Sequence, residues 1–121
     1  MKIYIAHSSG FDFKNEIYKP IRESKLNTEH EFILPHEKND KQYSSKELFQ
    51  SKSVDIIIAE VSFPSTGLGI ELGLADMSGI KSVGIYKSGS NLSGSVRSFF
   101  KELLEYNKGD LVKNLEELLR S

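Results

Sequence analysis

The sequence contains no cysteine, only three prolines, and no apolar run long enough to cross a bilayer. The absence of cysteine excludes disulfides, thiolate metal sites and cysteine nucleophiles, and it fits a reducing compartment. The apolar part of the first ten residues is too short for a signal peptide. We therefore expect a cytoplasmic protein with no membrane partner.

The sequence also lacks an excess of charge, with 16 basic and 17 acidic residues. It shows no basic stripe, so we expect no nucleic acid polymer as a partner. A small anionic ligand is compatible with this composition, because it needs only a local pocket. The 121 residues, 38% of them apolar, are enough for one domain over residues 1–121 with a single core.

Short apolar segments alternate with amphipathic ones along the whole chain. Residues 103–106 could form a further strand or continue a helix, and the pattern does not separate the two. Pro20 predicts a kink or a late start in the first helical segment. Strands are predicted over residues 2–6, 31–34, 54–61 and 82–86, and helices over 13–24, 67–78, 93–104 and 110–119. One or two helical turns are predicted over 45–51, capped by Ser44 or Ser45. A surface loop is predicted over 37–45.

The three consecutive isoleucines at 56–58 indicate a strand covered on both faces, which is typical of a parallel sheet. Together with the strand–helix alternation, they predict an α/β fold. We expect a single-domain, doubly wound (flavodoxin- or Rossmann-like) parallel sheet of four to five strands, with helices on both faces. In such sheets ligands bind outside the carboxyl ends of the strands, at the switch point. The turns that follow the strands are therefore the places to search.

The turn after the third strand combines Ser65, Gly67 and Gly69 just before a predicted helix. The glycines let the backbone approach a ligand, and the free N–H groups of the helix favour an anion such as a phosphate. No Lys-Ser/Thr pair follows the glycines, so the turn is not a P-loop, and their spacing does not match the dinucleotide-binding fingerprint. A tight strand-to-helix connection would show the same pattern.

Glu71 is the only ionisable side chain between Val61 and Ala75. Its helix is apolar nearly all round, which predicts burial. A buried carboxylate is costly unless it is paired, so Glu71 is either half of a structural ion pair or a chemical group. Its place one turn beyond the glycine turn favours chemistry. Glu60 and Asp55, at the two ends of the buried strand, are predicted to be structural.

With these residues in view, the sequence resembles the nucleoside 2-deoxyribosyltransferase superfamily. Within it, the similarity is greatest to the 2′-deoxynucleoside 5′-phosphate N-hydrolase branch. The resemblance covers most of the chain, and its central block is quite specific. It rests on residues 4–6 (YIA), 55–61 (DIIIAEV), 64–73 (PSTGLGIELG) and 92–97 (LSGSVR).

The resemblance implies a hydrolase that cleaves (deoxy)nucleoside 5′-monophosphates at the N-glycosidic bond, giving free base and sugar 5-phosphate. Glu71 matches the nucleophile, and Tyr4 matches a tyrosine near the sugar. Glu47 stands where the family has its acid, usually an aspartate. No cofactor is expected. The three histidines lack metal-ligand spacing, so no catalytic metal is expected either.

The resemblance also implies a substrate-binding set and a homodimer, in which residues 93–95 of each subunit complete the neighbouring site. Ser93 could instead simply cap its helix. The hydrolases usually carry a phosphate-binding arginine in the first turn. Here residues 7–10 contain none, and His7 and the serine hydroxyls are the candidates to replace it. The substrate-binding set comprises Ala6, His7, Ser8, Ser9, Gly10, Tyr18, His36, Ser65, Gly67, Gly69, Ser93, Gly94 and Ser95.

Three other functions fit the sequence. A nucleoside 2-deoxyribosyltransferase would exchange bases between unphosphorylated nucleosides. A non-catalytic nucleotide-binding module would fit the missing arginine and the Glu47 replacement. A flavodoxin-like flavin carrier would share the architecture.

Overall fold

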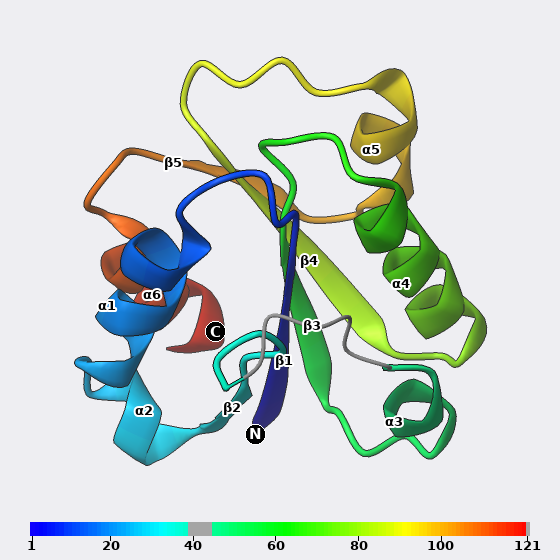
Figure 1. Ribbon diagram of the computed structural model, residues 1–121, viewed down its shortest axis with the longest axis horizontal. Coiled ribbons are helices and arrows are strands. Elements are labelled where there is room, and N and C mark those ends of the chain that lie inside the picture. Colours follow the sequence, from blue (N-terminus) through cyan, green and yellow to red (C-terminus); the bar gives the residue numbers. More distant parts are fainter. Residues whose placement is uncertain (39–44, 121) are drawn as a thin grey trace.

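The computed structural model describes residues 1–38 and 45–120, which form one five-stranded, all-parallel sheet with helices on both faces (Figure 1). The strand order is β2-β1-β3-β4-β5, so the predicted fold class is confirmed. The strands are β1 (Lys2–His7), β2 (Glu31–Ile33), β3 (Ile56–Glu60), β4 (Lys81–Lys87) and β5 (Leu103–Tyr106).

The helices form two layers, one on each face of the sheet. In Figure 1, α1, α2 and α6 lie on the left of the strands, and α3, α4 and α5 lie on the right. The π-helical segment η1 leads into α1. The helical segments are η1 (Lys14–Tyr18), α1 (Lys19–Arg22), α2 (Leu26–Glu29), α3 (Lys46–Gln50), α4 (Thr66–Met77), α5 (Gly94–Phe99) and α6 (Leu111–Arg120).

Alternate residues of β1 enter two separate cores, because successive side chains of a strand point to opposite faces. Ile3 and Ile5 pack with α1 and α6, whereas Tyr4 and Ala6 pack with α3 and α4. All five residues of β3 are buried, as the isoleucine run predicts. The chain leaves β1 toward α1 on one face and β3 toward α4 on the other. The switch point therefore lies between β1 and β3.

Two predicted helices differ from the structure. Residues 13–24 form η1 followed by α1, with Pro20 in the first turn of α1, where its missing N–H costs nothing. The helix predicted over 93–104 ends at Phe99, and β5 follows. A Cβ on Gly84 of β4 would lie 2.7 Å from Leu103 and 2.9 Å from Phe100. The absence of a side chain there lets this segment pack on β4 as the fifth strand. The short helix α2 was not predicted.

The prediction that the helix carrying Glu71 is buried all round is wrong. Leu68, Leu72 and Ala75 of α4 are buried, but Ile70 is 66% exposed and Met77 is 87% exposed. The helix therefore has an apolar face toward solvent. Within the described part of the chain, no helix is long and apolar enough to cross a bilayer. Ser44 and most of the predicted loop 37–45 lie outside the described residues.

Candidate functional site

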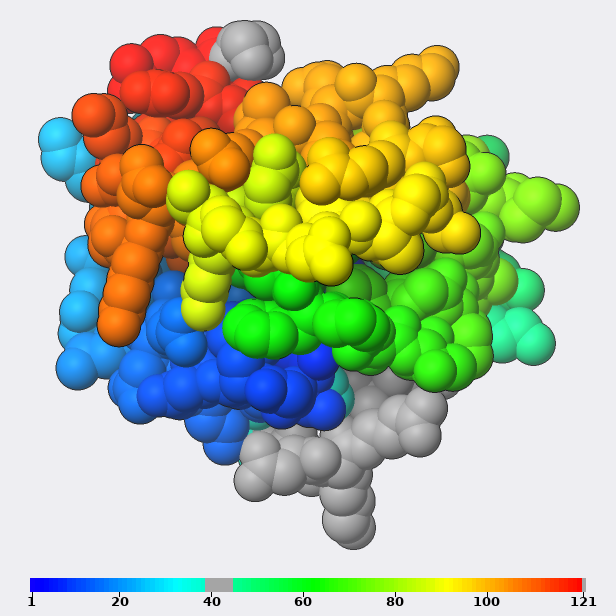
Figure 2. All heavy atoms as spheres, turned by 90° about the horizontal axis from the view of Figure 1, so that it is seen from above, coloured from blue at the N-terminus to red at the C-terminus, as the bar shows by residue number. Residues whose placement is uncertain are grey.

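Several of the predicted site residues lie just beyond the carboxyl ends of the strands: residues 7–10 at the end of β1, residues 65–69 after β3, and residues 93–95 after β4. Figure 2 looks onto this edge, where the segment after β1 (blue) meets the segment after β3 (green), with the segment after β4 (yellow) beside them. The strand register brings His7, Glu60 and Ile85 side by side, as it does Lys87 and Tyr106. Side chains from distant parts of the sequence can therefore act together here.

Glu71 lies on α4, is half-buried, and faces β1. Its Oε2 atom accepts a hydrogen bond of 2.6 Å from the Tyr4 hydroxyl and one of 2.8 Å from the Ser45 hydroxyl. Oε1 accepts no hydrogen bond from any described residue, and no described cation lies within ion-pair distance of the carboxylate. Of the two interpretations that the sequence left open, a structural ion pair therefore finds no partner in residues 1–38 and 45–120.

Ser45 is a site residue that sequence analysis assigned only to helix capping. It occupies the N-cap position of α3, but its side chain makes no capping hydrogen bond and contacts Glu71 instead. Glu47, two residues further along α3, is exposed and forms none of the hydrogen bonds to Glu71. The structure therefore brings Tyr4, Ser45 and Glu71 together, and it places Glu47 next to this group without joining it.

His7, Tyr18 and His36 form a second polar cluster on the other face of β1. His7 Nδ1 lies 2.8 Å from the Ser8 carbonyl, which can only accept, so Nδ1 carries the proton. The neutral ring then accepts the Tyr18 hydroxyl at Nε2, over 2.6 Å. Tyr18 in turn accepts the backbone N–H of His36 at 3.0 Å. The first turn and the end of β2 are therefore linked through one tyrosine.

The pKa values in this cluster follow its burial. Burial lowers the pKa of His7, the Ser8 carbonyl opposes the shift, and nearby His36 adds to it. Burial raises the pKa of Tyr18 well above its usual range, against the N–H of His36, while the charges of Glu37 and Glu71 raise it further. Both side chains are therefore neutral near pH 7.

Lys87 was not singled out by the sequence, yet it contacts both turns at the switch point. Its ammonium group pairs with Glu16 of η1 and lies 5.0 Å from the ring centroid of Phe11 and 5.2 Å from that of Phe63. The two rings stack at 4.8 Å with an interplanar angle of 26°. Phe11 follows β1 and Phe63 follows β3, so the stack spans the crevice between the two strands. No local sequence pattern predicts a contact among four separate elements.

Glu60 is fully buried at the end of β3 and makes two hydrogen bonds. Oε1 accepts the backbone N–H of Ser62 at 2.6 Å, and Oε2 accepts the hydroxyl of Tyr106. Burial raises the pKa of Tyr106, and its hydrogen bond to Glu60 and the Glu60 charge raise it further. The predicted structural role for Glu60 is confirmed, as is that of Asp55, which accepts the N–H of Lys2 at 2.7 Å.

The serines of the other predicted binding turns hold local structure. Ser8 is buried and its hydroxyl accepts the N–H of Gly10 at 3.0 Å. Ser65 caps α4 by accepting the N–H of Leu68 at 3.3 Å, and Ser93 caps α5 by accepting the N–H of Val96 at 3.2 Å. Capping is one of the two roles that the sequence left open for Ser93. Ala6 is buried within β1, whereas Ser9, Gly10, Gly67, Gly69, Ser93, Gly94 and Ser95 are exposed.

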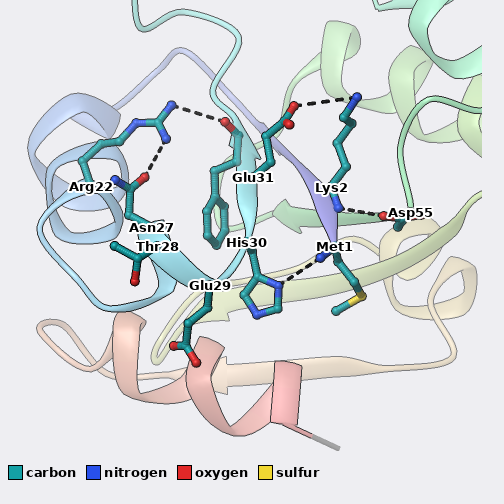
Figure 3. Close-up of a pocket in the computed structure, with 10 residues that line it drawn as sticks. Met1, Lys2, Arg22, Asn27, Thr28, Glu29, His30, Glu31 and Asp55 are labelled. Atoms are coloured by element: carbon teal, nitrogen blue, oxygen red, sulfur yellow. Dashed lines mark hydrogen bonds and ion pairs between the residues drawn. The ribbon is translucent and has the colours of Figure 1, made fainter.

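A shallow pocket of about 620 Å³ lies at the opposite edge, around the amino ends of β1 and β2 (Figure 3). Most of its charged groups already have partners. Lys2 pairs with Glu31, Arg22 pairs with Glu37, and the Met1 amine contacts His30. Ligands of doubly wound sheets bind at the other edge. We therefore place the candidate site at the carboxyl ends, where a smaller cavity of about 220 Å³ also lies beside Glu16 and Lys87.

The comparison with solved structures finds proteins of the same fold. The chain is similar to the CMP N-glycosidase BcmB of Clostridium botulinum, with a TM-score of 0.61 and 19% sequence identity over 98% of each chain. The two proteins share a fold. No family model and no curated protein matches the sequence. At this level of identity the likeness establishes the fold, and the activity needs support from the residues of this chain.

Proposed function

We propose that the protein hydrolyses the N-glycosidic bond of (deoxy)nucleoside 5′-monophosphates, with Glu71 as the nucleophile. The observation that carries this proposal is the state of the Glu71 carboxylate. It is half-buried, it lacks a cation among the described residues, and both of its hydrogen bonds converge on Oε2. Oε1 is thereby left as the oxygen that can attack. The fold shared with a CMP N-glycosidase supports the same class of reaction.

The proposed reaction has two steps, as in retaining glycosidases. In the first step Glu71 Oε1 bonds to the anomeric carbon, and the bond from that carbon to the base nitrogen breaks. The base leaves with a proton, which we assign to Glu47. In the second step water attacks the anomeric carbon and gives its proton to Glu47, and the bond to Glu71 breaks. Sugar 5-phosphate is released and both carboxyl groups are regenerated.

Tyr4 and Ser45 would position the nucleophile. Tyr4 is fully buried, so its hydroxyl is fixed by the core and approaches Oε2 from β1. Ser45 approaches the same oxygen from the start of α3. Two fixed donors on one oxygen orient the carboxylate and direct the other oxygen toward the substrate.

The test is release of free base from a panel of nucleoside monophosphates, compared between the wild-type protein and Glu71→Gln. We expect the variant to lose activity by roughly 10⁴-fold or more while remaining folded. Asp76→Asn makes the same chemical change at an exposed position of α4 and is the matched control. Rapid quenching and mass spectrometry of the peptide containing Glu71 should show a sugar phosphate adduct. Wild-type rates in Glu71→Gln would refute the nucleophile.

The proposed role of Glu47 as the acid is tested with two substrates whose leaving groups differ in their need for a proton. Its support is that Glu47 is exposed and lies two residues from Ser45, which donates a hydrogen bond to Glu71. Glu47→Gln should lower kcat/KM for natural nucleotides by about 10²- to 10³-fold. A sugar phosphate with a 4-nitrophenolate leaving group needs no proton, so the loss should largely disappear with it. A loss that is equal for both substrates would exclude the acid role.

We also propose that the active form is a homodimer in which residues 93–95 complete the site of the neighbouring subunit. The exposed apolar side chains of Ile70 and Met77 on α4 support an interface there. Mixing inactive Glu71→Ala with Ser93→Ala subunits should restore part of the activity, because one site of the mixed dimer has both residues. No recovery in a confirmed mixed dimer would contradict the shared site.

A further inference from the structure

The Lys87 cluster, which comprises Lys87, Glu16, Phe11 and Phe63, has no role in the reaction described above. Its members come from the end of β4, from η1, and from the turns after β1 and β3. The side chains of Lys87 and Glu16 are only 23% and 29% exposed, so the pair is held within the edge of the sheet and does not extend freely into solvent. A partly buried cation at a ligand-binding edge requires an explanation.

The cluster places positive charge between the two turns that the proposed function assigns to the substrate. Phe11 follows residues 7–10 directly, and Phe63 lies two residues before Ser65. The ammonium of Lys87 contacts both rings. It thus contacts residues of both turns, and residues 7–10 contain no arginine or lysine of their own. A dianionic 5′-phosphate bound at these turns would meet backbone N–H groups, hydroxyls and this ammonium.

From this juxtaposition we propose that Lys87 binds the 5′-phosphate of the substrate and makes the enzyme prefer nucleotides to nucleosides. The inference rests on the proposed function. An ammonium group has three N–H donors, and its contact with Glu16 leaves others for a phosphate oxygen. The aromatic faces of Phe11 and Phe63 hold the cation by attraction to their π electrons without neutralising it. Glu16 balances its charge while the site is empty of substrate.

The kinetic test compares Lys87→Met with the wild type on one deoxynucleoside 5′-monophosphate and on the same deoxynucleoside without phosphate. The ratio of the two kcat/KM values should fall by roughly 10- to 100-fold, as expected for loss of a charged hydrogen bond. Lys87→Arg should keep most of the preference. Lys108→Met removes an exposed lysine that lines the same small cavity, and should leave the ratio unchanged. Equal losses on both substrates, or an unchanged ratio in Lys87→Met, would overturn the proposal.

A binding measurement separates this proposal from the proposed function. Calorimetric titration with 2-deoxyribose 5-phosphate needs no turnover. The wild type should bind it at least about 10-fold more tightly than Lys87→Met, and Lys108→Met should bind like the wild type. If wild-type protein and Lys87→Met bind this probe equally, or if the wild type does not bind it, the phosphate role is wrong. Binding that depends on Lys87 without any release of base would instead refute the hydrolase and keep the phosphate site.

Discussion

Glu60 and Glu71 are eleven residues apart in the sequence, and each accepts a hydrogen bond from a tyrosine, but their surroundings differ. Glu60 is fully buried and uses both oxygens, one for the Ser62 N–H and one for the Tyr106 hydroxyl. Glu71 is half-buried and receives both hydrogen bonds on one oxygen. The first environment gives each oxygen a donor, whereas the second leaves Oε1 of Glu71 without a donor among the described residues.

The difference is made by the elements that supply the donors. At Glu60 the donors come from the adjoining turn and from β5, and they hold the ends of β3 and β5 together. Ser62 extends this network, because its hydroxyl accepts the N–H of Lys87 at 2.8 Å. At Glu71 the donors come from β1 and from the residue before α3, and both approach from one side. A closed network stabilises the sheet edge, whereas a one-sided one orients a group toward a ligand.

The largest expected effect is on stability, when each glutamate is replaced by alanine. Glu60→Ala leaves the Tyr106 hydroxyl and the Ser62 N–H buried without a partner, which should lower the free energy of unfolding by about 2 to 4 kcal/mol. Glu71→Ala should lower it by less than Glu60→Ala does, because Glu71 is half-buried and water that enters the vacated space can replace it as acceptor for the Tyr4 and Ser45 hydroxyls. Urea unfolding of both variants measures the difference. Equal losses would mean that Glu71 is a structural group like Glu60.

Replacing Tyr106 and Tyr4, the tyrosine donors to Glu60 and Glu71, tests the same comparison with a smaller expected effect on stability. Tyr106→Phe removes the donor to Glu60 Oε2 and should cost about 1 to 3 kcal/mol of unfolding free energy. Tyr4→Phe leaves Ser45 on the same oxygen of Glu71, so its cost should be about 1 kcal/mol or less. The activities should follow the opposite order, with kcat reduced in Tyr4→Phe and nearly unchanged in folded Tyr106→Phe. A kcat loss confined to Tyr106→Phe would reverse the assignment of the two networks.

The hydrogen-bond network of Glu60 was easier to predict from the sequence than that of Glu71. Glu60 ends a run of buried β-branched residues, so its need for nearby turn amides follows from the strand itself. Glu71 could be selected because it is isolated among apolar residues next to a glycine turn. The sequence overestimated its burial, because the apolar residues Ile70 and Met77 of the same helix face solvent. Apolar composition alone does not distinguish a core from an exposed face.

The contacts that the sequence did not predict all join distant elements. The hydroxyl of Ser45 reaches Glu71 across 26 positions, although the local pattern favours a helix cap. Residues 103–106 become a strand because Gly84 leaves room for Phe100 and Leu103 on β4. The contact of Lys87 with Phe11 and Phe63 depends on the register of the whole sheet. Such contacts have no periodicity or spacing that a single sequence displays.

The smallest expected effect concerns His7, a titratable side chain whose two ring nitrogens both form hydrogen bonds. His7 donates to the Ser8 carbonyl and accepts from Tyr18, an arrangement that requires the neutral ring, and burial lowers its pKa in the folded protein. The unfolded chain therefore binds a proton on His7 more readily than the folded one. The contribution of His7 to stability is complete above the unfolded pKa of about 6.5, and it decreases as the pH falls from there through the lowered folded value.

Urea unfolding at pH 7.5 and pH 5 should show a smaller loss of unfolding free energy on acidification in His7→Gln than in the wild type. His30→Gln changes a half-buried histidine that contacts the Met1 amine and lies outside the His7–Tyr18 pair, and it is the matched control. If His7→Gln loses as much stability as the wild type between these pH values, the neutral-ring arrangement of His7 and Tyr18 is wrong.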